Sequence, residues 1–305
     1  MYAKTLSFLA AASLALAQRP SNTSMCDYYT TALFTDNTAA NQYALVKAVV
    51  DRAGVGNATS NPVVTGIVKP GMYNGVKVDI SPYFTGALNS TNRGGSSGVS
   101  VNFLDGGSGA TPAANSNQAI LFTHLYEYFG AVLGCTTYGS SGYPNYAGKA
   151  SMYEVHKFMG LDENMVGYFN EQVGLSAASF GVTNDDVTAV GKALNSLFNV
   201  KCAPATTVIK EQGAQLQSIC IADSCPLSPN ATCSSYQSEP MPVAVMPGSS
   251  SNSSSSGNSS SSSGSATHSS GSSSTGSSPA QQTTNAASAM GVSAVVGVAA
   301  LLFAL

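Results

Sequence analysis

Charged residues are scarce in this 305-residue chain, which has 12 lysines and arginines, 15 aspartates and glutamates, and only 3 histidines. The cations form no basic stripe and no arginine cluster, and binding to a nucleic-acid backbone depends on such a concentration of positive charge. The sequence therefore predicts no nucleic-acid partner.

Motifs that signal catalysis or metal binding are also missing. The chain has no Gly-x-Ser-x-Gly elbow, and its few histidines, of which His268 lies in a Ser-rich tail, supply no credible Ser/His/Asp set. No CxxC or HxxxH spacing supports a zinc site, and no glycine-rich loop continues into a phosphate-binding Lys-Ser or Lys-Thr. The acidic residues show no spacing that selects a carboxylate pair for glycoside cleavage. These absences favour a protein that is not an enzyme.

The N-terminus has the pattern of a secretory signal peptide over residues 1–17. Lys4 supplies a positive charge, an apolar run follows from Leu6 to Leu16, and small residues precede Gln18. The run is shorter than the about 20 apolar residues that a membrane span needs. We therefore expect cleavage before Gln18.

The C-terminus has the pattern of a signal for a glycosylphosphatidylinositol anchor. Asn285-Ala286-Ala287 is followed by a short spacer and by an uncharged apolar tail from Gly291 to Leu305. We expect removal of residues 286–305 and attachment of the anchor to Asn285, with Ser277 or Ser278 as the alternative. A tail-anchored helix is the competing interpretation, and the secretory signal argues against it.

Residues 237–285 are predicted to form a disordered stalk. From Pro247 to Thr284 they are mostly serine with glycine, asparagine and threonine, and they offer no apolar surface to offset the entropy cost of ordering. Such a composition suits O-glycosylation and a spacer role. Sequons of the form Asn-x-Ser/Thr predict N-glycosylation at Asn22, Asn57, Asn89, Asn230, Asn252 and Asn258.

The remaining residues, 18–236, have the length of one domain with a Cys-containing C-terminal appendage. Apolar residues recur with helical spacing over 39–52 and 117–133, and further helices are expected to begin after the capping residues Ser151, Asp162 and Thr183. The sequence therefore predicts an all-α domain.

A long irregular insertion is predicted over about residues 57–111. Glycine, proline, asparagine and serine are frequent there, and only residues 76–80 and 99–104 have a strand-like pattern.

The six cysteines are even in number, and in an oxidising compartment we expect them to pair as disulfides. Three of them cluster over residues 220–233. If all pair, at least one bridge has to connect this cluster to the rest of the domain, and the pairing itself is left open by the sequence. The expected disulfide cysteines are Cys26, Cys135, Cys202, Cys220, Cys225 and Cys233.

Two histidines fall on helices of the predicted domain. His156 lies on the apolar stripe that Met152, Val155 and Met159 form, and a neutral core histidine is the simplest interpretation of one such residue. His124 lies on the helix over 117–133. Two histidines on different helices can face one another across a flat cofactor such as haem, whose iron takes an axial imidazole nitrogen.

The segment Tyr146-Ala147-Gly148-Lys149-Ala150-Ser151-Met152-Tyr153-Glu154-Val155-His156, preceded by Gly134-Cys135, resembles the truncated haemoglobins. That family carries a Gly-Gly turn and then Tyr-x-Gly-Arg-x-Met-x-x-x-His, where the histidine is the proximal haem ligand. Weaker similarity extends to Leu33-Phe34, to Phe169 and to Gly181-Val182, and about half of the mature domain is covered.

The resemblance implies a globin-like fold and haem bound through an axial histidine. It places His156 on the haem iron and Lys149 where a basic residue meets a haem propionate. His124 would be the polar residue of the distal side, beside Leu125 and Phe129.

The chain also departs from the family pattern. Leu121 and Leu125 stand near positions that are often polar, Val50 stands where a ligand-binding tyrosine is usual, and Cys135 replaces the second glycine. An apolar distal wall is expected to hydrogen-bond bound oxygen weakly.

Two functions are consistent with these observations. The first is a glycolipid-anchored surface protein whose globin-like domain binds haem and a small gas. The alternative is a haem-free structural or adhesion module with cell-wall polysaccharide as its partner. Glycolipid-anchored proteins with Ser-rich stalks resemble surface proteins of filamentous fungi, so the expected location is the outer face of the plasma membrane or the cell wall.

Overall fold

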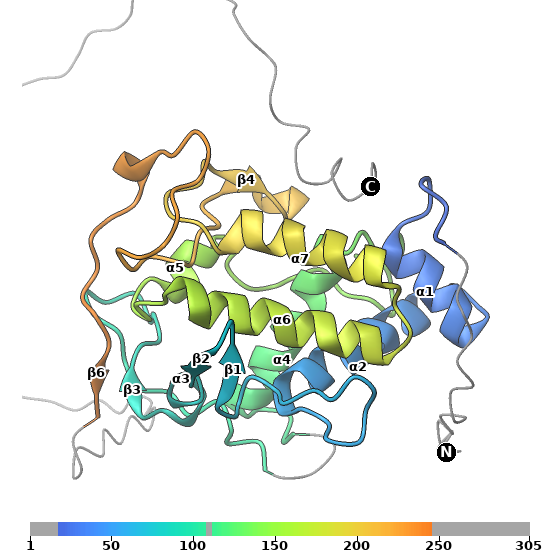
Figure 1. Cartoon of the computed structure of the whole chain (residues 1–305), viewed down its shortest axis with the longest axis horizontal. Helices are drawn as coiled ribbons and strands as arrows, with labels where there is room; N and C mark the ends of the chain where they lie inside the picture. Colours follow the sequence, from blue (N-terminus) through green and yellow to red (C-terminus); the bar gives the residue numbers. More distant parts are fainter. Residues whose placement is uncertain (1–17, 108–111, 246–305) are drawn as a thin grey trace, which may run out of the picture. The chain divides into compact units, whose positions relative to one another are not determined.

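The computed structural model describes residues 18–107 and 112–245 of the chain. These residues form a mostly helical domain with very short strands (Figure 1). The predicted helical class is confirmed, with the correction that short two-stranded sheets accompany the helices. The predicted signal peptide, the anchor signal with Asn285, and the sequons Asn252 and Asn258 lie outside the described residues.

The helices begin where the capping residues predict. Apart from the short α3, each starts after a serine, threonine or aspartate whose side chain accepts a hydrogen bond from a backbone N–H of the first turn. The first helix was not predicted. The helices are α1 (Met25–Phe34), α2 (Ala39–Val55), α3 (Pro82–Thr85), α4 (Asn117–Val132), α5 (Met152–His156), α6 (Glu163–Ser179) and α7 (Asn184–Phe198).

Two helix pairs form the framework of the domain. Helix α6 packs against α7, and α2 packs against α4, while α2 also contacts α6 and α1. In Figure 1, α6 and α7 lie side by side in front of α4 and α2. The buried core lies between these layers and includes Val46, Phe129, Val166 and Leu194.

The start of α7 shows how a buried charge is satisfied. The backbone N–H of Asp186 donates to Oγ1 of the capping residue Thr183 over 3.5 Å. The Asp186 carboxylate pairs with the Arg19 guanidinium at 3.1 Å. It also accepts a hydrogen bond of 2.7 Å from the Tyr29 hydroxyl. A buried charge is costly unless it is paired and hydrogen-bonded, so this contact fixes the N-terminal segment on α7.

The insertion is part of the core. It contains the hairpin of β1 (Gly71–Tyr73) and β2 (Val76–Val78), then α3 and β3 (Leu88–Asn89). The strand expected over 76–80 is thus formed in part, whereas residues 99–104 contribute only an isolated bridge between Val99 and Thr91. Ile67, Val78, Ile80 and Tyr83 are buried with the helices. Two further small sheets pair β3 with β6 (Val243–Ala244) and β4 (Thr206–Thr207) with β5 (Ala214–Gln215).

Three disulfides join all six cysteines, as expected. Cys26–Cys135 joins α1 to the residues after α4, Cys202–Cys233 connects the C-terminal cysteine cluster to the chain after α7, and Cys220–Cys225 lies within that cluster. The bridge to the cluster that the cysteine distribution required is therefore confirmed. Such bridges are typical of a domain that folds in an oxidising, extracellular-type compartment.

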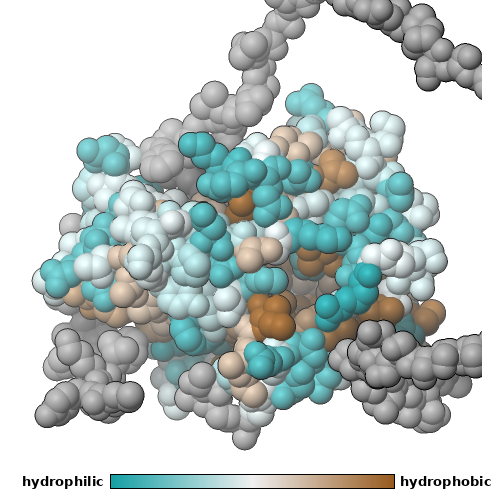
Figure 2. All heavy atoms as spheres, turned by 180° about the vertical axis from the view of Figure 1, so that it is seen from behind, coloured by the Kyte–Doolittle hydropathy of each residue, from teal (hydrophilic) through white to brown (hydrophobic). Residues whose placement is uncertain are grey.

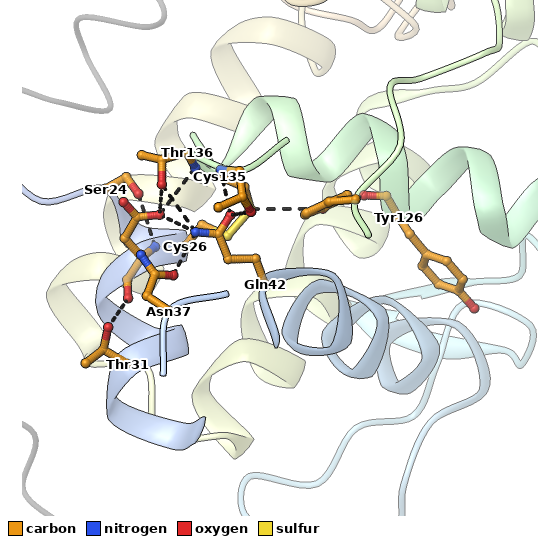
Figure 3. The surroundings of a disulfide bond; sticks show 11 residues. Ser24, Cys26, Thr31, Asn37, Gln42, Tyr126, Cys135 and Thr136 are labelled. Atoms are coloured by element: carbon orange, nitrogen blue, oxygen red, sulfur yellow. Dashed lines mark hydrogen bonds between the residues drawn. A yellow bond between two sulfur atoms is a disulfide. The ribbon is translucent and has the colours of Figure 1, made fainter. Parts of the chain in front are cut away.

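The Cys26–Cys135 bridge lies beside a polar cluster that joins the same elements (Figure 3). Gln42 is fully buried, and its amide nitrogen donates to Asp27 over 2.6 Å and to Asn37 over 2.7 Å. Thr136 donates to the same Asp27 carboxylate over 2.9 Å. Helices α1 and α2 and the chain after α4 are thus linked by both a covalent bond and hydrogen bonds.

None of the helices in residues 18–107 and 112–245 has the length and apolar character that crossing a membrane requires.

The first disulfide should contribute more stability than the last. Replacing Cys26 and Cys135 with alanine frees a loop of 109 residues in the unfolded chain, whereas replacing Cys220 and Cys225 frees one of 5. The chain-entropy estimate gives losses of about 5 and about 2 kcal/mol in the free energy of unfolding. Urea unfolding of the two double variants measures this difference. Both bridges are buried, so each double variant is a control for the other. Equal losses in the free energy of unfolding would contradict the argument from loop length.

Candidate functional site

An apolar pocket lies between α4 and α5 and has a volume of about 180 Å³. Helix α4 contributes Leu121, Leu125 and Phe129, and α5 contributes Met152 and His156. Seen from behind, brown apolar surface surrounds a hollow on the side of the molecule where α5 and β3 lie (Figure 2). An apolar concave site with a few polar groups is the usual form of a small-molecule site.

His156 is oriented by a hydrogen bond within its own helix. Its Nδ1 lies 2.8 Å from the carbonyl oxygen of Met152, four residues earlier. A carbonyl oxygen accepts only, so Nδ1 carries the proton and donates it. In the neutral ring, Nε2 then has an unprotonated lone pair, and none of the described residues hydrogen-bonds to it.

Burial keeps this imidazole neutral. Loss of water around the ring lowers the pKa of His156, and the hydrogen bond to Met152 opposes that effect only in part. The residue lines the pocket and is only partly buried. A neutral imidazole with one nitrogen fixed by a carbonyl is the arrangement that metal-binding histidines adopt.

The other polar groups of the lining are already bonded or small. The Tyr83 hydroxyl donates to the Met159 carbonyl oxygen over 2.8 Å, and the Tyr128 hydroxyl donates to Gln217 Oε1 over 2.9 Å. Burial raises the pKa of Tyr83 to about 12, so it remains a neutral donor. Ser90 and Thr91 complete the polar part of the wall. Nε2 of His156 is therefore the polar atom best placed to recognise a ligand.

The structure brings some of the predicted site residues together. His156, Leu125 and Phe129 line the same pocket, and the Phe129 ring lies 6.4 Å from that of Phe169. His124 instead packs against the edge of Tyr146, with ring centroids 5.5 Å apart, and burial lowers its pKa. Lys149 is exposed, and neither it nor His124 lines the pocket.

Sequence reasoning missed the walls that come from irregular segments. Ile80, Tyr83, Phe84 and Phe103 belong to the insertion, and Ile219 belongs to the Cys-containing appendage. The cluster Pro82-Tyr83-Phe84 was the available signal, since two adjacent aromatic residues in a polar stretch indicate local burial.

The lining residues have the chemistry that haem binding requires, but the pocket is small. A free axial nitrogen and walls of leucine, methionine and phenylalanine fit a porphyrin, and unbranched methionines adapt their shape to a ligand. The pocket volume is larger than that of a cavity that holds benzene, about 150 Å³. It is smaller than the about 300 Å³ at which the usual range of ligand pockets begins. The pocket is thus too small to enclose a whole porphyrin, which would extend out of it. No lysine or arginine lines the pocket to pair with the carboxylates of a haem, so these would lie in water.

Metal binding by protein ligands alone finds no support in the part of the chain that the structure describes. Within residues 18–107 and 112–245, no group of three or more histidine, cysteine, aspartate or glutamate side chains is arranged to hold an ion.

The stability of the domain should depend on pH through His156. Its pKa in the folded protein is lower than the usual 6.5, so the unfolded chain binds the proton more readily. The free energy of unfolding is therefore expected to decrease as the pH falls from about 6.5 through the lowered pKa of the native state. Replacing His156 with phenylalanine should flatten this dependence. Urea unfolding between about pH 7.5 and 5 tests it, and His124, present in both proteins, does not affect the comparison. An unchanged slope would contradict a buried neutral imidazole.

Comparisons of the chain with models of protein families, with curated proteins and with solved structures found no match. The proposals below therefore depend on the pocket and on the sequence pattern around His156.

Proposed function

We propose that this protein is a haem-binding protein held at the cell surface by a glycolipid anchor. Haem would enter the pocket between α4 and α5, with His156 Nε2 as the axial ligand of the iron. The observation that carries the proposal is the hydrogen bond from His156 Nδ1 to the Met152 carbonyl oxygen, which leaves Nε2 free in an almost wholly apolar pocket. When bound, haem supplies an iron that can bind a small gas.

The arrangement of helices supports a globin-like fold. The pairs α2 with α4 and α6 with α7 pack on one another through α2 and α6, and α5 follows α4 after an irregular connection. The segment that resembles the truncated haemoglobins ends in α5, and its histidine lines the same pocket as Leu121 and Leu125 of α4.

The part of the wall that α4 forms suggests how strongly such a site would retain a gas. Leu121, Leu125 and Phe129 offer no hydrogen-bond donor, and His124 points to Tyr146. A bound polar ligand such as oxygen would gain no hydrogen bond from these side chains, so we expect weak retention of oxygen. Distal donors and pocket polarity are what separate oxygen binding from other haem chemistry.

The surface location is supported by the disulfides and by the position of the sequons. Asn22 and Asn230 are exposed, as glycosylation requires, and Asn57 and Asn89 are partly exposed. The anchor signal itself remains a prediction from the sequence.

A hemin titration tests the proposal. The full chain, produced in a secretory host, should develop a sharp Soret absorption band as hemin is added. His156→Ala should weaken binding at least about tenfold, because it removes the axial nitrogen. His124→Ala is the matched control, since it removes a second half-buried imidazole outside the pocket and should leave the spectrum unchanged.

Circular dichroism of each variant verifies that the domain is folded. If the folded wild-type protein shows no specific spectral change, or if His156→Ala binds hemin as well as His124→Ala does, the haem proposal fails. A surface-displayed structural or adhesion module, with polysaccharide as the candidate partner, would then be the better account.

A further inference from the structure

Helix α5 needs support from outside because it has only five residues. A helix this short is not stable through its own hydrogen bonds. Two residues of the insertion bind the helix and the chain that follows it: Asn92 Nδ2 donates to the Glu154 carbonyl oxygen over 2.7 Å, and the Tyr83 hydroxyl donates to the carbonyl oxygen of Met159, just after α5. The position of His156 therefore depends on what contacts α5.

Residues 237–245, here called the strap, hold α5 from another side. The Tyr153 hydroxyl accepts from the Gln237 backbone N–H over 2.9 Å and donates to the Gln237 carbonyl oxygen over 3.1 Å. The Glu239 carboxylate lies 3.2 Å from Lys157 Nζ, and the two side chains are only 9% and 13% exposed. Tyr153 and Lys157 flank His156 on the helix, so the strap binds the helix that carries the proposed ligand.

The strap also reaches a second part of the pocket wall, next to β3. Its strand β6 pairs with β3, and Val245 donates to the Ala87 carbonyl oxygen over 2.9 Å. Ser90 and Thr91, directly after β3, line the pocket. In Figure 1 the strap runs as an extended orange segment from the appendage to β3. It thus connects two walls of the same pocket.

The strap buries little apolar surface. Its strand has two residues, and Met241 and Val243 are 65% and 61% exposed. Segments with little buried apolar surface open locally at low free energy. Residues 237–245 were predicted to belong to the disordered stalk, and the structure instead pairs their strand β6 with β3 of the domain. The rest of the predicted stalk follows directly, so a force transmitted along the stalk would reach the strap before the rest of the domain.

We propose that the strap is a clasp that regulates the pocket. When the strap is docked, it fixes the position of α5 and His156. When it is released, α5 becomes more mobile and the pocket binds its ligand more weakly. Coupling of this kind is reciprocal, so a bound ligand also tightens the strap. The ligand part of the proposal rests on the proposed haem site, whereas the hold on α5 does not.

Hydrogen exchange measured by mass spectrometry on the full chain tests the clasp. Glu239→Ala removes the strap's carboxylate from Lys157, and Glu154→Ala removes the helix's own carboxylate, 3.2 Å from the same nitrogen. We expect Glu239→Ala to speed exchange of the amides of residues 152–160 at least about tenfold relative to the control, with α2 unchanged. Equal exchange in the two variants would overturn the proposal. Glu239→Gln, which keeps the shape of the side chain, replaces the alanine variant if that variant is not secreted.

A hemin titration of the same variants tests the coupling. Glu239→Ala should bind hemin several-fold more weakly than Glu154→Ala, and saturating hemin should slow exchange of residues 237–245 in the wild-type protein. Equal affinities would overturn the coupling. If no protein binds hemin, the proposed haem site fails, and the exchange experiment alone decides whether the strap holds α5.

Discussion

The constraint on which the site depends is the length of α5. Five residues make too few backbone hydrogen bonds to be stable alone, so the helix exists only because its surroundings hold it. Ser151 caps its start and also donates to the Leu216 carbonyl oxygen, while the insertion and the strap bind its exposed backbone and side chains. His156 is thus positioned by tertiary contacts, and its single hydrogen bond to Met152 then decides which nitrogen faces a ligand.

The same constraint explains why the irregular segments belong to the core. The insertion contributes Tyr83 to the pocket wall. It hydrogen-bonds α5 through Asn92 and the chain just after α5 through Tyr83, and the appendage contributes Ile219. These segments have little regular structure of their own. Disulfides fix the appendage, whereas buried apolar residues and hydrogen bonds fix the insertion. Gln217, fully buried, joins Tyr128 of α4 to the Ala150 carbonyl oxygen just before α5. Scarce charges favour this solution, because a neutral amide costs less to bury than an ion.

Functionally, the pocket combines one available acceptor nitrogen with walls that are mostly apolar apart from Ser90 and Thr91. Such a site recognises a ligand by shape, by apolar contact and by coordination or a hydrogen bond at Nε2. A flat, apolar group with a metal centre satisfies these requirements together. The sequence assigns residues 237–245, the strap, to the stalk, but in the structure they lie on the domain. The strap thus connects the pocket to the rest of the predicted stalk.

The sequence by itself determined the helical class, the starts of α4, α5, α6 and α7, the expectation that all six cysteines form disulfides, and the apolar stripe with His156. These features follow from caps, periodicity and composition, which act over a few residues. Helix α1 was missed because its polar residues, Asp27 and Thr30 among them, obscure the apolar period. The disulfide partners, the separation of His124 and Lys149 from the pocket, the walls from the insertion, and the strap were decided only by the tertiary structure. Each depends on which distant segments meet, and local pattern carries no information about such contacts.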